Sequence, residues 1–192
     1  MFKEKVKSQD VATSSLIAGS SAADSASAKG VYKIQCHDAQ GNLKWEAEAP
    51  NLVVNEGLQD MNAKYFTGTT YTAAWYLGLY GSGATNSPAA GNTMASHSSW
   101  TEVTDYSQAT RPACTFGTPT TANPSVATNS ASPATFSING TTTVGGAFLT
   151  SNNTKSGTTG TLYSAADFSS PGDRSVVSGD TLSVTYTLSL AG

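Results

Sequence analysis

Few side chains in this sequence have the chemistry for acid–base, nucleophilic or metal-binding work. The chain has two histidines and two cysteines, namely His37, His97, Cys36 and Cys114. Cys36 and His37 are adjacent in a predicted strand, where successive side chains point to opposite faces, so they cannot bind one ion together. The cysteines lack a C-x-x-C spacing, and a single disulfide between them is left open. These residues predict no metal site and no cofactor.

The remaining candidates for catalysis are a histidine beside serines and a pair of carboxylates. His97 lies between two serines, but the chain has 26 serines and no G-x-S-x-G motif to position one as a nucleophile. Glu102 and Asp105 are close enough in sequence to suggest a glycosidase pair. The polar loop around them favours capping and turn roles instead. The sequence therefore predicts a protein that is not an enzyme.

Hydroxyl groups dominate the composition. Serine and threonine make up 53 of the 192 residues, whereas aspartate, glutamate, lysine and arginine contribute 23. The charged share is 12%, about half of the usual value of about 25%. This is too little charge for a helical bundle or coiled coil, and a net charge of −3 offers no positive field to a nucleic acid. We expect strands that carry Ser and Thr on their outer faces, and no nucleic-acid partner.

The first 30 residues form a separate region that is rich in Ser and Ala. Lys3, Lys5 and Lys7 lie near its tip, and its longest apolar run is residues 16–18. This run is too short for a secretory leader, and no stretch of the chain approaches the roughly 20 apolar residues of a membrane span. We expect residues 1–30 to be an extended arm that a partner chain orders, in a protein made in a cytoplasm and without a membrane partner.

A regular strand pattern starts directly after the arm. Tyr32, Ile34 and Cys36 alternate with polar residues, which is the pattern of a half-buried strand. Turn-forming residues at 38–42 separate this segment from a second alternating one that ends at Ala49. The sequence predicts a β-hairpin here.

One helix is predicted near residues 56–65. Asn55 precedes it and has a side chain suited to the N-cap position. Leu58, Met61 and Tyr65 fall at i, i+3 and i+7, which places them on one narrow apolar stripe. We expect this stripe to pack against a sheet.

Beyond residue 71 the pattern is one of short strands between long polar loops, which is typical of β-sandwiches. The strongest strand is the last, where five apolar residues between 182 and 190 alternate with Ser and Thr. One helical turn is expected at 93–100 and an irregular segment at 115–129. The other predicted strands are 73–80, 134–143, 146–150 and 161–163. The sequence predicts a mainly β protein, an antiparallel β-sandwich over residues 31–192 with one short helix, preceded by the arm of residues 1–30.

The three tryptophans have different predicted roles. Trp45 and Trp75 alternate with other apolar residues and are assigned to the core. Trp100 lies in the polar stretch 97–102. Because exposed tryptophans often anchor interfaces, Trp100 is predicted to be a surface interface residue.

Four segments together suggest a family. They are 51–58 (NLVVNEGL), 74–79 (AWYLGL), 106–112 (YSQATRP) and 178–188 (SGDTLSVTYTL). These segments resemble small virion proteins of tailed bacteriophages, over about residues 30–192 and without any catalytic motif. The resemblance implies a capsid decoration or cement protein, with a jelly-roll-like sandwich that clamps neighbouring subunits of the major capsid protein.

The resemblance also implies roles for the arm and for oligomers. The arm would lie across junctions between major-capsid subunits and bury Leu16 and Ile17, while the three tip lysines meet acidic patches or remain a solvated tip. The protein would pair with itself as a dimer or trimer on the capsid exterior of a virion assembled in the host cytoplasm, so that many weak contacts act together. The alternative is a tail or fibre component that binds a host receptor or glycan through Trp100 and the long loops.

Overall fold

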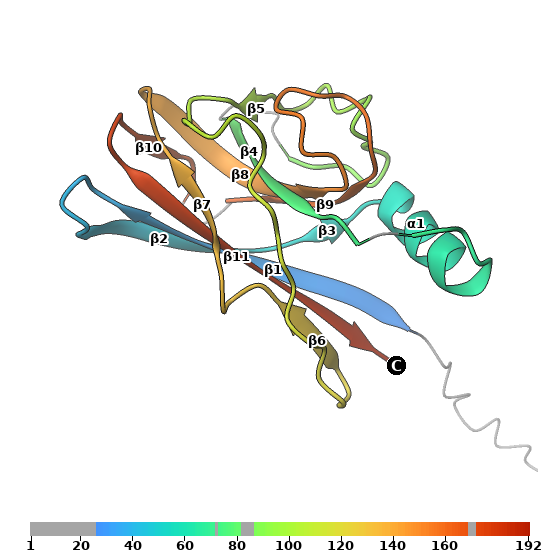
Figure 1. Ribbon diagram of the computed structural model, residues 1–192. Helices are drawn as coiled ribbons and strands as arrows, with labels where there is room; N and C mark the ends of the chain where they lie inside the picture. Colours follow the sequence, from blue (N-terminus) through green and yellow to red (C-terminus); the bar gives the residue numbers. More distant parts are fainter. Residues whose placement is uncertain (1–25, 72, 82–86, 169–171) are drawn as a thin grey trace, which may run out of the picture.

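The structure of the chain is a computed structural model that describes residues 26–71, 73–81, 87–168 and 172–192. These residues form two antiparallel sheets that pack face to face, with one short helix at one end (Figure 1). The predicted antiparallel β-sandwich is therefore confirmed. Among the described residues, no helix is long and apolar enough to cross a bilayer.

Sheet A forms the lower layer in Figure 1. Its strands are β1 (Ser27–His37), β2 (Leu43–Pro50), β6 (Ser125–Thr128), β7 (Ala134–Ser137) and β11 (Thr181–Ala191). The long strand β11 pairs along its whole length with β1 on one side, and with β7 and then β6 on the other. β2 pairs with the free side of β1 and completes the predicted hairpin.

Sheet B forms the upper layer. Its strands are β3 (Leu52–Val53), β4 (Tyr76–Gly81), β5 (Glu102–Val103), β8 (Thr142–Thr150), β9 (Leu162–Asp167) and β10 (Arg174–Val176). The central strand β8 has β4 on one side and β9 and β10 on the other, while β3 extends from β9 and β5 from β4. Helix α1 (Asn55–Phe66) lies beside β9.

The main core fills the space between the two sheets. Alternate residues of β1 and β11 point into it, as in the pairs Tyr32 with Tyr186 and Ile34 with Val184, and all four side chains are fully buried. This is the expected result of strict alternation, because one face of each strand then removes its apolar surface from water.

A buried cluster of polar groups crosses this core. The hydroxyl of Tyr32 lies 2.7 Å from Oγ of Ser164 in sheet B, and Ser164 Oγ lies 3.3 Å from the hydroxyl of Tyr186. The amide of Asn51 also donates to the Tyr186 hydroxyl at 2.7 Å. Each tyrosine hydroxyl is thus satisfied where leaving it unpaired would be costly, and the contacts hold the two sheets in one alignment.

A second, smaller core lies on the other face of sheet B. Leu79 of β4 points into the main core, whereas the next residue, Tyr80, points into the second one. The members of the second core are Val54, Tyr80, Met94, Trp100, Phe148, Leu162 and Ala165. Sheet B is therefore covered on both faces, which explains why Val144–Thr150 of β8 is buried at every position.

Several predicted elements differ in detail from the structure. β1 begins at Ser27, so the last four residues of the predicted 1–30 arm belong to sheet A. Residues 93–100 form turns and an isolated bridge instead of a helical turn, and the segment predicted as irregular at 115–129 contains β6. The predicted strand at 134–143 is divided between β7 and β8.

The helix forms where predicted but starts differently. Val54 holds the N-cap position, without a side-chain capping bond, and Asn55 is the first helical residue. The side chain of Glu56 instead accepts a hydrogen bond from the Leu162 backbone of β9. This contact ties the first turn of the helix to sheet B.

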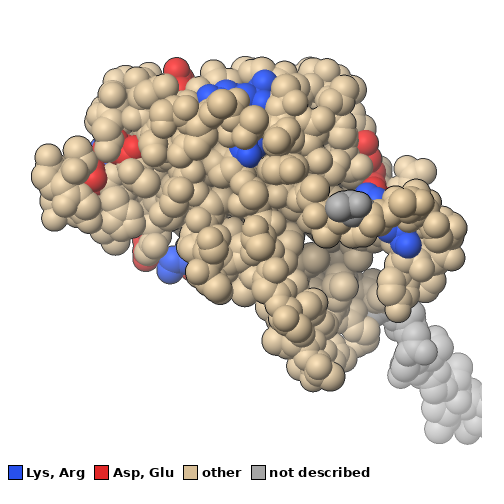
Figure 2. All heavy atoms as spheres, in the orientation of Figure 1, with Lys and Arg blue, Asp and Glu red and all other residues tan. Residues whose placement is uncertain are grey.

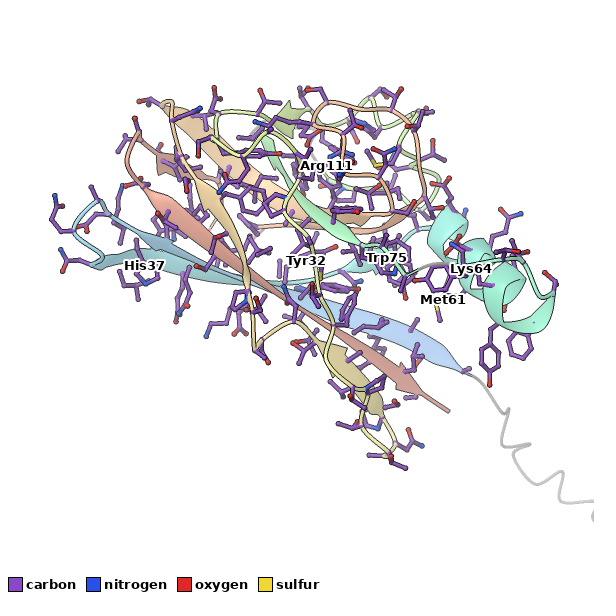
Figure 3. The ribbon with its side chains drawn as sticks, viewed as in Figure 1. Tyr32, His37, Met61, Lys64, Trp75 and Arg111 are labelled. Atoms are coloured by element: carbon purple, nitrogen blue, oxygen red, sulfur yellow. The ribbon has the colours of Figure 1, made fainter. Side chains whose placement is uncertain are left out.

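The helix also packs with a different face from the one predicted. Gly57 is its only buried residue, and a Cβ atom there would collide with the backbone carbonyl of Tyr163. Met61 packs against the main core, and Lys64 lies over the rings of Tyr71 and Trp75, as Figure 3 shows for Met61, Lys64 and Trp75. The close approach that glycine permits selects this face, so Met61 is the only residue of the predicted stripe that packs inward.

Candidate interaction surface

The arm residues that were predicted to meet a partner precede the described part of the chain. Lys3, Lys5, Lys7, Leu16 and Ile17 all lie outside the described residues. Their contact with a partner therefore stays a prediction.

The prediction that Trp100 is a surface interface residue is wrong. Its side chain is 3% exposed and belongs to the second core. His97 stacks on its ring at 3.8 Å, Phe148 lies at 5.0 Å, and its indole nitrogen donates to the Asn92 side chain. Trp100 anchors the loop that covers sheet B. Its neighbours in sequence are polar because they lie on the solvent-facing side of that loop.

The two cysteines are free thiols, so they do not form the disulfide that the sequence left open. Burial, reinforced by the nearby Asp180 carboxylate, raises the pKa of Cys36 to about 11. Burial raises the pKa of Cys114 to about 12. Both groups are therefore protonated at neutral pH and poor nucleophiles. His37 lies on the opposite face of β1 from Cys36 and is part-exposed, as predicted.

Glu102 does not pair with Asp105 for acid–base chemistry. It forms a bidentate ion pair with Arg111, with distances of 2.9 Å from Nε and 2.7 Å from Nη2, and it also accepts a hydrogen bond from the backbone of Ser156. Arg111 donates further to the carbonyl oxygens of Asn152 and Gly157.

This arrangement is structural. Arg111 is 1% exposed, so its guanidinium and the Glu102 carboxylate satisfy each other and fasten two loops together above sheet B. In the sequence, Arg111 stands only within one segment of the resemblance, 106–112. The signal in the sequence that could have identified it is a lone arginine next to Pro112 in a weakly charged chain.

The surface with the clearest capacity to bind a partner is the outer face of sheet A. Ser and Thr side chains occupy it along three neighbouring strands, and each is part-exposed or exposed. We call these residues the hydroxyl face: Thr181, Ser183, Thr185, Thr187 and Ser189 of β11, Thr135 and Ser137 of β7, and Thr128 of β6. Along β11 they recur about every 6.8 Å, because every second residue of a strand faces the same side.

Charge on this side of the molecule is confined to the other half of sheet A. Lys33 of β1 lies 3.6 Å from Glu46 and 3.7 Å from Glu48 of β2, and the three side chains partly neutralise one another. Figure 3 shows His37 on this outer side, near the turn between β1 and β2. No residue of the hydroxyl face carries a charge. Figure 2 shows a further face of the molecule, where charged side chains are also few and scattered.

The edges of sheet A are less suited to binding than its face. The backbone of β6 already accepts hydrogen bonds from Gly117 and Thr120, at the carbonyls of Thr128 and Val126. The other edge strand, β2, carries charged side chains and ends in a proline, two features that oppose strand addition. A partner would therefore meet side chains of the face instead of adding a strand.

A second surface feature is a hollow of about 460 Å³ beside the second core. It lies between the 95–102 loop and the 156–158 loop. Its lining includes the hydroxyl groups of Ser96, Ser98, Thr101, Ser156 and Thr158, together with His97. The hollow can offer many neutral hydrogen bonds, but the ring of Trp100 beneath it is covered by His97.

Within the described part of the chain, no group of three His, Cys, Asp or Glu side chains could hold a metal ion. Comparison of the chain with protein-family models, with curated proteins and with solved structures finds no match in any of the three. Function must therefore be argued from the surfaces.

Proposed function

We propose that this protein is a non-enzymatic structural protein of a phage virion that binds and stabilises the capsid shell as a decoration or cement protein. The observation that carries the proposal is the hydroxyl face, whose side chains are uncharged and part-exposed or exposed. Its partner would be the major capsid protein, and further copies of the chain would pack beside it as dimers or trimers.

The chemistry of the hydroxyl face supports binding to another protein surface. Hydroxyl groups both donate and accept hydrogen bonds and rotate to suit their partner. Covering them costs much less than covering Lys or Glu, because burying an unpaired charge is far more expensive than burying a neutral polar group. A decorated shell repeats the contact many times, so a modest affinity per copy is sufficient.

The arm would add a second contact in this proposal. Leu16 and Ile17 would be buried at a junction between capsid subunits, and Lys3, Lys5 and Lys7 would meet acidic patches there. The two contacts are joined by one chain, so each raises the local concentration of the other.

A charge placed in the hydroxyl face tests the proposal. Ser183 lies opposite the neutral residues Gln35 and Thr135. The diagonal neighbour Lys33 already pairs with Glu46 and Glu48, so Ser183→Glu gains no unpaired cation. We expect at least about tenfold weaker binding to purified phage particles, because burying an unpaired carboxylate costs more than about 1.4 kcal/mol. Occupancy is measured by co-sedimentation.

The matched control is Asn153→Glu, which places the same charge on an exposed residue of the loop between β8 and β9 of sheet B, away from the hydroxyl face. It should bind like the unmodified protein. Equal binding by the Ser183→Glu variant would exclude the hydroxyl face as the contact, and failure of the unmodified protein to bind any particle would overturn the proposed function.

The hollow beside His97 favours a second candidate function. A hydroxyl-rich hollow, whose one lining carboxylate, Glu102, is paired with Arg111, fits a glycan. This would make the protein a tail or fibre component that binds a host receptor. Thr158→Trp would fill the hollow, so it should abolish glycan-array signals if this function holds. An array on which the unmodified protein binds nothing would remove this candidate.

A further inference from the structure

The outward side of α1 carries large apolar side chains that the sandwich does not use. Leu58 is 45% exposed, Tyr65 83% and Phe66 77%. Leu58 and Tyr65 are seven residues apart, which is about two helical turns, so they lie on the same side of the helix. The rings of Tyr65 and Phe66 contact each other edge to face at 4.9 Å. We call Leu58, Tyr65 and Phe66 the helix stripe.

An amphipathic helix normally turns its apolar side to the core and its charged side to water, and α1 does the reverse. The charged side chains point toward the sandwich. Glu56 accepts a hydrogen bond from the Leu162 backbone, Asp60 accepts one from the Thr161 hydroxyl, and Lys64 lies over the Trp75 ring. The apolar residues are left outside, although aromatic side chains gain most from burial. Exposed apolar groups of this size mark an interaction surface.

We propose that in the free protein the helix stripe is the docking surface for this chain's own Leu16 and Ile17. Two pairs of adjacent large apolar residues precede Ser27, Met1 with Phe2 and Leu16 with Ile17, and the second pair is the nearer one to the described part of the chain. Docking would cover two apolar groups at once. The proposal concerns the protein before it meets any partner, so it does not rest on the proposed function.

The chain is long enough for this contact. The backbone of Asn51 donates a hydrogen bond to the Gly30 carbonyl, and α1 begins four residues later, within about 14 Å. Ser27 lies three residues from Gly30, or about 10 Å along β1. Ile17 lies ten positions before Ser27, and this length of chain can span about 33 Å, which is enough to reach the first turn of α1, where Leu58 lies. Figure 1 shows α1 and the start of β1 at the same end of the molecule.

The tether also favours the chain's own segment over that of a second copy. A short covalent tether holds its end at an effective concentration in the millimolar range. A second copy at micromolar concentration competes poorly with that. The stripe and its flanking exposed residues, Gln59 and Asn62, are uncharged, so nothing repels a neutral apolar pair.

Docking of this kind would keep the apolar pair of the arm away from water until a partner competes for it. Under the proposed function, that partner is the shell, and the arm would exchange one apolar contact for another. The helix stripe would then be released when the arm binds.

A spin label on the arm tests the proposal in the full chain. Cys36 and Cys114 are 0% and 4% exposed, so a cysteine introduced as Ser15→Cys can be labelled selectively. We expect the amide NMR signals of residues 58–66 to lose most of their intensity through paramagnetic broadening. A label at Ser178→Cys, in an exposed turn outside α1, is the matched control and should leave these signals unchanged.

Two further samples identify the contact. Tyr65→Ser with Phe66→Ser should abolish the broadening, and both residues are exposed enough for the fold to tolerate the change. A mixture combines spin-labelled protein that lacks ¹⁵N with ¹⁵N protein that lacks the spin label. No broadening is expected there, because the contact lies within one chain. Absence of broadening in the single-chain sample, its persistence without the two rings, or its appearance in the mixture would each overturn the proposal.

Discussion

Arg111 shows how one residue can look like a catalytic group and act as a structural one. It is charged and buried, stacks 5.3 Å from the Phe148 ring, and donates to a carboxylate and two carbonyls. These partners lie in β5, in β8 and in the loop between β8 and β9. The residue therefore determines whether the second core stays covered.

We predict that Arg111→Met destabilises the protein by about 3–5 kcal/mol, because Glu102 is left as an uncompensated buried charge. Chemical denaturation at neutral pH measures the loss. The double variant with Glu102→Gln should recover part of it. Lys33→Met removes two exposed ion pairs and should cost no more than about 1 kcal/mol. An Arg111→Met variant as stable as Lys33→Met would contradict the structural role.

The buried thiols and phenols predict a loss of stability in alkali. The pKa of Cys36 is raised to about 11, and those of Cys114 and Tyr163 to about 12, mainly by burial. Unfolded cysteine titrates near about 8.5 and tyrosine near about 10. The unfolded chain therefore releases protons first as the pH rises, and stability falls from above about pH 8.5 toward the folded pKa values.

Urea unfolding at a series of pH values measures this dependence. A variant with Cys36→Ala and Cys114→Ala should lose less stability between about pH 8.5 and 10, where only thiols titrate. The two proteins should then decline in parallel as tyrosines ionise. A flat profile for the unmodified protein up to pH 11 would show that these groups titrate normally.

At the scale of elements, helix α1 depends on a close backbone approach. Gly57 lies against the Tyr163 backbone, where no side chain fits. We predict that Gly57→Ala destabilises the protein by about 1–3 kcal/mol, as for an overpacked core site, and increases hydrogen exchange in α1. Gly91→Ala is the matched control, because a Cβ atom there meets nothing within 4 Å. Equal stability of the two variants would exclude the close approach.

The long strands were predictable and the doubly covered ones were less so. β1 and β11 alternate strictly because only one of their faces is buried, and this pattern is legible in sequence. β8 is buried on both faces, so its run through Gly145, Gly146 and Ala147 shows no alternation. The orientation of α1 escaped prediction because periodicity cannot show that a glycine will approach another backbone.

At the scale of the whole molecule, the boundary of the arm matters for experiment. Residues Ser27–Gly30 pair with Leu188–Ala191 of β11. We predict that deletion of residues 1–25 leaves a cooperatively folded domain, whereas deletion of residues 1–30 lowers the thermal midpoint because it removes these pairs. Differential scanning calorimetry compares them. Identical thermal midpoints would mean that the first four residues of β1 add no stability.

The candidate surface was predictable in composition but not in position. The excess of Ser and Thr indicated uncharged outer faces, yet only the structure distinguishes sheet A, which is open, from sheet B, which is covered. Trp100 was misassigned for the same reason, because a one-dimensional pattern does not show that a polar loop folds back over a sheet.

The absence of charge on the hydroxyl face has a consequence for ionic strength. Salt screens contacts between charged groups over about 10 Å at 0.1 M, and it has little effect on hydrogen bonds between neutral groups. An assembly held by this face should therefore withstand concentrated salt, while any contribution from the lysines of the arm is weakened. Washing particles in rising salt would separate the two contacts by their chemistry.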